Sequence, residues 1–294
     1  MDFLQQLKKK ALLVETSFEQ FLPDESAYPA IIHQAMRYSL LAGGKRLRPA
    51  LVIGAAECVG GKPEKVMPTA CALELIHTYS LVHDDLPAMD NDDMRRGKPT
   101  NHIIYGEAMS ILAGDALLTL AFQLIAENIK TAPAEAVTRV IQEVAKLSGS
   151  QGLIGGQVVD TMSADETINA ETLEYIHHHK TGALFKAAIR SGASLTEASD
   201  KQLQALTVYA ENLGLAFQIV DDILDVEGEA VKIGKPVGSD EKNKKATYPA
   251  LFGLENARHK ANMAADKAIT ALDIFGSEGE FLRNALHFII NRDH

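Results

Sequence analysis

Apolar residues recur at three- and four-residue spacing along almost the whole chain, and this periodicity limits the fold more than any other feature. The spacing is typical of helices that bury one face. It is clear in stretches such as AIIHQAMRYSLLAG, AVTRVIQEVAKLSG and ARHKANMAADKAITALDIF. Alternating apolar and polar residues, which are typical of β-strands, are scarce. The sequence therefore predicts an all-α protein.

The breaks in this pattern fall where glycine, proline and mixed polar residues cluster, as in AGGKRLRP, RRGKPTN and FGSEGE. None of them has the length or bias of a flexible linker, and no internal repeat or low-complexity tract is present. We therefore expect one domain over residues 1–294, built as a single bundle of about ten or more helices. The segments Ile111–Ile125 and Leu213–Leu224 are apolar over much of their circumference, which predicts central helices.

Charge and cysteine content narrow the class of protein. The formal net charge of -10 argues against a general nucleic-acid binder. Cys58 and Cys71 lie among apolar neighbours without metal-binding spacing, so we expect buried thiols in a reducing compartment. The N-terminus has no apolar signal region, and no later run approaches the ~20 apolar residues that span a bilayer. We expect a cytoplasmic protein with no membrane span and no nucleic-acid partner.

Two aspartate clusters each end an apolar helical run. In FQIVDDILDVEG, Asp221 and Asp225 are four residues apart and share one helix face, where like charges repel unless something neutralises them. In HDDLPAMDNDD, Asp84 and Asp90 are six apart, which leaves them roughly 120 degrees out of alignment on a regular helix. Pro87 disfavours helical geometry before it, so we expect a bend that returns Asp90 to Asp84.

A solvated helix end would explain either cluster alone, but two clusters on apolar helices favour a shared function. Carboxylate oxygens are hard ligands, and no histidine or cysteine lies at metal-ligand spacing beside them, which favours Mg²⁺ over zinc. Magnesium keeps waters and takes further ligands from substrate phosphates. The sequence therefore predicts a diphosphate held between the two clusters.

A phosphate ligand requires cations, and the basic residues that qualify fall into three groups. Each residue alone is better explained by an exposed surface cation than by a ligand, whereas together with the aspartates they describe a site for two anionic groups and metal. The GGK segment lacks P-loop spacing, so nucleotide binding is disfavoured. The His177–His179 run is interpreted as surface imidazoles, since neighbours on a helix point in different directions. The three groups are Lys45 with Arg48, Arg95 with Arg96, and Lys180 with Lys235 and Lys245.

Together these motifs resemble those of the short-chain trans-prenyltransferases, or polyprenyl synthases, and most closely those of the bacterial farnesyl diphosphate synthases (geranyltranstransferases). The similar segments follow the family order and cover most of the chain. They are GGKRLRP, ELIHTYSLVHDDLPAMDNDDMRRGKPTNH, GDALLTLAF, GLIGGQVVD, HHKTGALF, GLAFQIVDDILDV and GKPVGSDEKNKKATYP. The resemblance implies the isoprenoid synthase fold, a helical bundle around a deep central cavity that is usually dimeric.

The activity implied by the resemblance is the Mg²⁺-dependent head-to-tail condensation of isopentenyl diphosphate with dimethylallyl or geranyl diphosphate, giving farnesyl diphosphate and pyrophosphate. Three Mg²⁺ ions are expected on the allylic diphosphate when substrate is bound. No protein nucleophile is required, and the released pyrophosphate is the expected base.

Residue roles are carried over on the same basis. The resemblance assigns metal binding to Asp84, Asp90 and Asp221, with Asp85, Asp222 and Asp225 as further acidic partners. It assigns the allylic diphosphate to Arg95, Lys180, Lys235 and Lys245, and isopentenyl diphosphate to Lys45, Arg48, His77 and Arg96. It implies a catalytic role for Lys180 and, through oxygen dipoles that face the developing cation, for Thr181 and Gln218.

Product length is expected to depend on the residues just before the first cluster. Tyr79 is the fifth residue before Asp84 and Ser80 the fourth, and a bulky residue at the fifth position resembles the farnesyl pattern. Ideal geometry places Ser80 under Asp84 and turns Tyr79 roughly 140 degrees away, so a purely structural tyrosine is the alternative. The hypothesis is that Tyr79 closes the floor of the cavity.

Three other functions remain as alternatives. A geranylgeranyl diphosphate synthase differs only in product length. A terpene synthase of the same fold is disfavoured by Lys45, Arg48 and Arg96, which suit a second diphosphate. A non-catalytic regulatory subunit has no need of both aspartate clusters. The sequence leaves open which of Lys242, Lys244 and Lys245 contacts diphosphate, and the roles of Asp92, Asp93, Gln157 and Asp160.

Overall fold

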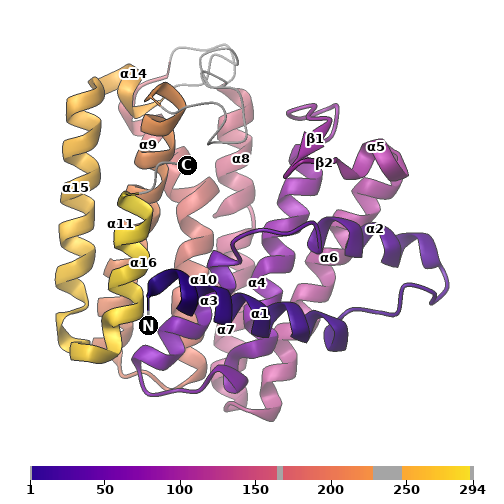
Figure 1. Ribbon diagram of the computed structural model, residues 1–294, viewed down its shortest axis with the longest axis horizontal. Helices are drawn as coiled ribbons and strands as arrows, with labels where there is room; N and C mark the ends of the chain where they lie inside the picture. Colours follow the sequence, from indigo (N-terminus) through magenta and orange to yellow (C-terminus); the bar gives the residue numbers. More distant parts are fainter. Residues whose placement is uncertain (1, 164–167, 228–246, 292–294) are drawn as a thin grey trace.

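The computed structural model describes residues 2–163, 168–227 and 247–291 (Figure 1). Lys235, Lys242, Lys244 and Lys245 lie outside these ranges. Within them the chain is almost entirely helical, which confirms the all-α prediction, and the only strands described form a hairpin of two residues each, β1 (Met94–Arg95) and β2 (Lys98–Pro99).

Within the described ranges, most helices follow one another with short connections, as the spacing of the polar breaks predicts. In chain order they are α1 (Phe3–Phe21), α2 (Ala30–Leu40), α3 (Leu47–Cys58), α4 (Pro63–Asp84), α5 (Asn101–Tyr105), α6 (Glu107–Glu127), α7 (Ala134–Ser148), α8 (Leu153–Met162), α9 (Ala170–Ile176), α10 (Ala183–Leu195), α11 (Asp200–Glu227), α14 (Tyr248–Phe252), α15 (Leu254–Ala271) and α16 (Glu280–Ile290). Short helical turns occur at η1 (Asn128–Lys130), η2 (His177–Gly182) and η3 (Asp273–Gly279).

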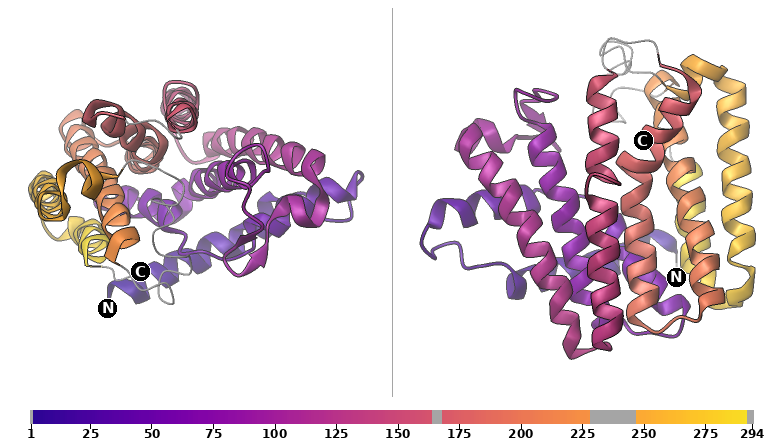
Figure 2. Two further views of the ribbon diagram at one scale, coloured as in Figure 1. Left: turned by 90° about the horizontal axis from the view of Figure 1, so that it is seen from above. Right: turned by 180° about the vertical axis from the view of Figure 1, so that it is seen from behind.

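The centre of the bundle is formed by α4, which packs against α3, α6 and α10. Its residues from Thr69 to Ile76 are all buried, so this segment has no exposed face. A helix that is apolar on every side is stable only when other helices surround it. Most of the long helices run side by side, whereas α1 lies across them (Figures 1 and 2).

The second half of the chain completes the bundle around α11, which packs against α10, η2, α15 and α16. Tyr209 on α11 is fully buried, and its hydroxyl donates to the carbonyl oxygen of Leu282 on α16 at 2.7 Å. The helix α15 forms one outer edge of the bundle (Figures 1 and 2). Leu213–Leu224 therefore occupies the central position that its composition predicts.

The helix α6 departs from that expectation. Ile111 and Leu112 are 46% and 49% exposed, so the segment Ile111–Ile125 is not surrounded on all sides, and the prediction of a fully central helix is wrong here. The stretch Glu107–Lys130 is also long and apolar enough to cross a membrane, with a mean hydropathy of 1.7 over its best window, of which 39% is buried. A core helix of a soluble protein has the same properties, so this is weak evidence for a span.

Both cysteines are free and buried, as predicted. Cys58 is 3% exposed, and burial raises the pKa of its thiol to about 12. Cys71 is fully buried beside Val14. Thiols with raised pKa values are poor nucleophiles, so both residues serve as small apolar groups in the core.

Candidate active site

The first aspartate cluster forms where α4 ends at Asp84. The chain then turns, with Pro87 in second position and the Met89 amide donating to the Leu86 carbonyl at 2.9 Å. The Asp90 amide donates to the Asp84 carbonyl at 2.8 Å. Proline has the fixed backbone angle that this turn position favours. The bend predicted from Pro87 is therefore present, and residues six apart in sequence become neighbours.

Burial and neighbouring charges both act on the ionisation of this cluster. Burial raises the pKa of Asp84 to about 6, and the charge of Asp90 adds to this effect. The positive charge of Lys180 acts against this rise in the pKa of Asp84. Burial lowers the pKa of Lys180, but the charges of Asp160, Asp84 and Asp90 outweigh burial and raise it above its ordinary value. A further cation at this position would favour the ionised form of Asp84.

Asp85 binds Arg95. The Arg95 Nε lies 2.8 Å from Asp85 Oδ1 and its Nη2 lies 2.6 Å from the same oxygen. Asp92 Oδ2 is 3.8 Å from Arg95 Nη2, and Asp93 Oδ1 lies 4.0 Å from His102 Nε2. The pair of Asp85 and Arg95 fixes the β1–β2 hairpin to the end of α4.

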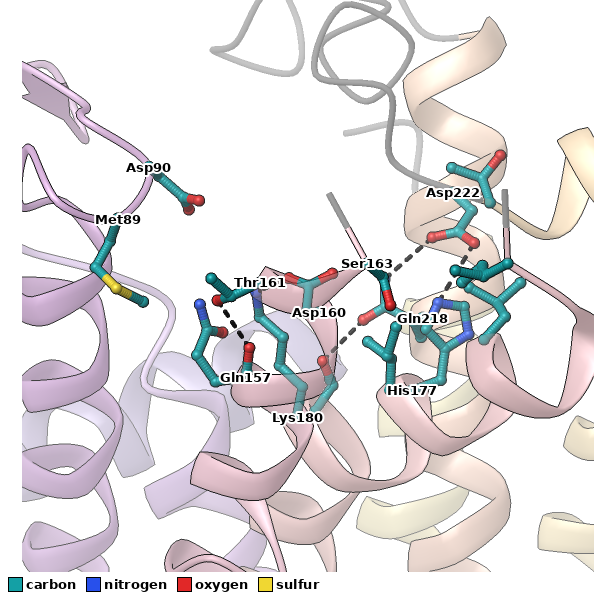
Figure 3. Close-up of a pocket in the computed structure, with 15 residues that line it drawn as sticks. Met89, Asp90, Gln157, Asp160, Thr161, Ser163, His177, Lys180, Gln218 and Asp222 are labelled. Atoms are coloured by element: carbon teal, nitrogen blue, oxygen red, sulfur yellow. Dashed lines mark hydrogen bonds and ion pairs between the residues drawn. The ribbon is translucent and has the colours of Figure 1, made fainter. Parts of the chain in front are cut away.

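A cavity of about 220 Å³ opens beside the first cluster (Figure 3). Asp90 stands on one wall and Asp222 on the other, with Lys180 and Asp160 between them. Lys180 Nζ lies 2.6 Å from Asp160 Oδ2. Gln157, Thr181 and Gln218 also line this cavity. The structure thus brings the turn after α4 together with α8, η2 and α11 around one cavity.

The far wall of this cavity carries a chain of hydrogen bonds. The Thr181 hydroxyl donates to Gln218 Oε1 at 2.8 Å, and Gln218 Nε2 donates to Asp222 Oδ1 at 3.1 Å. Asp222 Oδ2 accepts from the backbone amide of Tyr248 at 2.9 Å. The chain therefore joins η2, α11 and α14.

His177 does not lie at the surface, so the interpretation of the whole histidine run as surface imidazoles is wrong. Its side chain is 5% exposed, with Nε2 3.6 Å from Asp222 Oδ2 and the ring stacked on Tyr248. Burial lowers the pKa of His177 to about 3. His178 is exposed, and His179 stacks on Tyr175 at 3.8 Å between ring centroids. The π-helical turn η2 rotates these neighbours into different environments.

Asp221 and Asp225 lie in the unbroken helix α11, so they share a face as predicted. Asp221 is half-buried. Burial lowers the pKa of Arg48, and the negative charge of Asp221 offsets part of this lowering. Within the described ranges, no three histidine, cysteine or acidic side chains converge closely enough to hold a metal ion on their own. The two aspartate clusters stand on separate elements, which suits a metal that shares its coordination with water and phosphate.

A second cavity, of about 550 Å³, gathers the four residues carried over for the second diphosphate. Lys45, Arg48, His77 and Arg96 all line it. Burial and the positive charges of Arg48 and Arg96 hold the pKa of His77 well below its ordinary value, so the imidazole is neutral at pH 7. The Arg48 guanidinium lies 4.9 Å from the Phe185 ring centroid.

The described residues compensate the buried charge of Arg48 only in part. Its Nε is buried, with no hydrogen-bond partner among the described residues, and burial lowers its pKa to about 10. Arg96, with a left-handed backbone at φ 53°, donates to the Gly43 carbonyl. A buried guanidinium without full pairing is costly, which indicates that an anion completes its environment.

Sequence reasoning missed several residues of the second cavity. Arg46 lines it but is 2% exposed and bonds Glu74 Oε1 at 2.8 Å and the Leu40 carbonyl at 2.7 Å. Phe288 and Ile289 of α16 line it as well. The only sequence signal for Phe288 and Ile289 is helical periodicity, which does not predict which part of the protein a helix packs against.

The two positions expected to set product length have different environments. Tyr79 is 4% exposed and packs edge-on against His83, with ring centroids 5.8 Å apart. Its hydroxyl is buried and finds no hydrogen-bond partner in the part of the chain that the structure describes. Ser80 donates to the His77 carbonyl at 2.9 Å, back along its own helix. A Cβ on Gly114 of α6 would lie 2.1 Å from His83 Nε2, so only glycine allows this approach.

Comparison with known proteins gives the family. The family model for polyprenyl synthetase matches residues 29–274. The chain belongs to the polyprenyl synthetase family. Among curated relatives, geranylgeranyl diphosphate synthase of Cyanophora paradoxa is 47% identical over 100% of this chain and 97% of its own length. Farnesyl diphosphate synthase of Geobacillus stearothermophilus is 47% identical over 98% of this chain and 97% of its own.

Solved structures agree with this assignment to the polyprenyl synthetases. Geranylgeranyl pyrophosphate synthetase from Pyrococcus horikoshii superposes with a TM-score of 0.90 at 34% identity, covering 99% of this chain and 98% of that chain. A structure titled as a putative farnesyl-diphosphate synthase from Marinomonas gives 0.85 at 41% identity, covering 99% and 100%. The resemblance found in the sequence motifs is therefore confirmed, and the fold is that of this family.

Proposed function

We propose that this prenyltransferase condenses isopentenyl diphosphate head-to-tail with dimethylallyl or geranyl diphosphate, giving farnesyl diphosphate and pyrophosphate. The observation that carries the proposal is a pair of cavities with different charge. The first combines Asp90, Asp160 and Lys180, whereas the second combines Lys45, Arg48 and Arg96. A diphosphate that arrives with metal suits the first cavity, and a metal-free diphosphate suits the second.

The two aspartate clusters supply donors that fit magnesium. Asp84, Asp90 and Asp221 carry carboxylate oxygens, which are the ligands that Mg²⁺ prefers, and Asp90 lines the first cavity. We propose these three residues as its ligands, with three ions expected when the allylic diphosphate is bound. When bound, Mg²⁺ neutralises charge that develops on the leaving diphosphate.

The protein's own groups do the remaining work. Lys180 and Arg95, with Lys235 and Lys245 proposed beside them, hold the allylic diphosphate, while Thr181 and Gln218 present oxygen atoms to the cation that forms. Fixed dipoles and cations aimed at developing charge commonly supply the largest share of catalysis. The apolar walls exclude water from the cation. The double bond of isopentenyl diphosphate then attacks, and the released pyrophosphate takes the proton that is lost.

Two alternatives are less well supported. A terpene synthase does not bind a second diphosphate, so it does not require the second cationic cavity. A non-catalytic subunit does not require two aspartate clusters. A geranylgeranyl product is distinguished only by chain length, and the named relatives include synthases of both products. The bulky side chain of Tyr79 at the end of α4 favours the farnesyl product.

We also propose a cytoplasmic homodimer of single-domain chains. One core cluster draws buried residues from α1 through α16, as a single domain over residues 1–294 requires. For the dimer, the exposed side chains of Ile31 and Leu112 border an open groove of about 640 Å³ between α2 and α6. Exposed apolar patches of this kind are typical of contacts between protein chains.

The test is incubation of the purified protein with Mg²⁺, labelled isopentenyl diphosphate and either dimethylallyl or geranyl diphosphate. We expect incorporation with both allylic substrates and a C15 product by chromatography. Incorporation that stops at C20 supports the geranylgeranyl alternative. Cyclised product from farnesyl diphosphate alone would indicate a terpene synthase, and the absence of any product would refute the synthase assignment.

A further inference from the structure

The side chain of Gln218 does not by itself determine which way its amide group is oriented. A glutamine amide has nearly the same shape in both orientations, but one end carries oxygen and the other carries two donors. Thr181 does not resolve the choice, because its hydroxyl can donate to the oxygen or accept from the nitrogen. Both residues line the first cavity, so the orientation decides which end of each dipole a bound cation meets.

Asp222 resolves the choice. An ionised carboxylate only accepts hydrogen bonds, so Gln218 must turn its nitrogen toward Asp222 Oδ1, 3.1 Å away. Its oxygen is then left for the Thr181 hydroxyl at 2.8 Å. That bond uses the hydroxyl proton, and the remaining electron pairs of Thr181 and Gln218 are available to the cavity.

Asp222 is itself held in place. It is 3% exposed, and its second oxygen accepts from the Tyr248 backbone amide at 2.9 Å. The His177 Nε2 lies 3.6 Å from that oxygen, and its ring stacks on Tyr248. These contacts come from η2 and α14. The position of the Asp222 carboxylate is therefore fixed by elements other than its own helix, α11. The reversed amide would place oxygen against carboxylate, which buries two acceptors without a donor.

We propose that Asp222 is a positioning residue that fixes the orientation of Gln218, and through it that of Thr181, so that both present oxygen to the allylic cation. In this role Asp222 acts through hydrogen bonding rather than by contact with metal or diphosphate. The inference rests on the proposed function only in naming the cation that the two oxygens face. The orientation itself rests on the carboxylate and its contacts with the described residues Gln218, Tyr248 and His177.

The first test is a double-mutant cycle. Asp222→Asn keeps the shape of the side chain but offers both a donor and an acceptor, so the Gln218 amide is free to reverse. We expect kcat to fall at least tenfold while KM for each diphosphate changes less than threefold, since the diphosphate contacts are untouched. Gln218→Glu alone sets two carboxylates against each other and should lower kcat further.

The double variant Asp222→Asn with Gln218→Glu restores the order of donors and acceptors at unchanged net charge. The amide introduced at position 222 then donates, and the carboxylate introduced at position 218 accepts from it and from Thr181 whichever way it turns. We expect at least a tenfold recovery of kcat over Asp222→Asn. Glu211→Gln removes another paired carboxylate from the same helix, where Glu211 binds Lys186 at 2.6 Å, and should leave kcat unchanged.

A binding readout separates positioning from folding. An allylic diphosphate analogue with a protonated amine in place of the ionising carbon should bind the wild-type protein more tightly than its neutral isostere, and Asp222→Asn should lose this preference. Equal thermal unfolding temperatures of the variants would exclude misfolding. If the two substitutions act additively on kcat, or if Asp222→Asn keeps both kcat and the preference, the inference is wrong.

Failure of the proposed function gives a different result. In that case the wild-type protein forms no product, but the side-chain amide signals of Gln218, assigned through their loss in Gln218→Glu, still report the orientation. A strong shift of these signals in Asp222→Asn would support the orientation without the activity. Unchanged signals would refute the orientation as well.

Discussion

The backbone amide of Asp90 donates to the backbone carbonyl of Asp84 at 2.8 Å, so the two ends of the first aspartate cluster are locked together. This contact fixes two negative charges close to each other before any metal is bound. Burial raises the pKa of Asp84 to about 6, and the nearby charge of Asp90 adds to this rise.

Asp84→Asn should therefore stabilise the metal-free protein while abolishing activity. The folded state keeps the Asp84 proton between about pH 4 and 6 whereas the unfolded state loses it, so the wild type loses stability as pH rises through this window. Above pH 6 we expect the variant to be more stable by about 1 to 3 kcal/mol. Denaturant titration in EDTA at pH 8 measures this. Asp93→Asn, at an exposed residue of the same loop, should change neither quantity.

Arg95→Lys should weaken both the hairpin and allylic binding. A lysine cannot reproduce the bonds that Arg95 makes through Nε and Nη2 to Asp85, whose side chain is 4% exposed. We expect a loss of about 1 to 3 kcal/mol in the free energy of unfolding and a KM for the allylic diphosphate raised at least tenfold. Lys98→Ala in the same hairpin should have little effect on either. A fully active and stable lysine variant would contradict the assignment.

Arg46 and Arg48 are two residues apart but should respond in opposite ways to methionine. Arg46→Met leaves Glu74 buried without its partner and should destabilise the protein by about 3 to 5 kcal/mol. Arg48→Met removes a buried guanidinium with an unsatisfied Nε, so stability should be unchanged or increased while KM for isopentenyl diphosphate rises. Thermal unfolding and steady-state kinetics separate the two. Equal loss of stability would argue against a substrate-binding Arg48.

Tyr79→Ala should lengthen the product. Removing a buried aromatic ring should also cost about 3 kcal/mol of stability. Tyr79→Phe is the matched control, because it removes only a hydroxyl that has no partner within the described residues, and it should keep both the C15 product and full stability. Chromatography of products from both variants is the measurement. If the alanine variant still stops at C15, Tyr79 does not close the cavity.

His177 should make the protein sensitive to acid. Because its folded-state pKa is lowered to about 3, the unfolded state binds its proton first as pH falls below about 6.5, and stability is lost down to about pH 3. His177→Gln should remove a slope of about 1.4 kcal/mol per pH unit from that range. Urea titrations at several pH values measure the difference. His259→Gln, at an exposed histidine, should follow the wild-type curve.

Helices, the proline bend and the grouping of Asp221 with Asp225 were predictable because each depends on residues close in sequence. Periodicity, turn chemistry and helix spacing act over a few residues and leave a local pattern. The resemblance to the family extended this to Lys45, Arg48, His77 and Arg96, which the structure does bring to one cavity.

Other features depended on the tertiary structure, because burial and pairing join residues far apart in the chain. Nothing local distinguishes Arg46, which forms an ion pair with Glu74, from Arg48, whose Nε has no hydrogen-bond partner among the described residues. A run of three histidines does not predict that His177 is the one that packs against Asp222. The orientation of the Gln218 amide is likewise determined by the neighbouring Asp222. The sequence by itself determined which chemical groups the site contains, and packing decided which of them are desolvated, paired and aimed at the cavity.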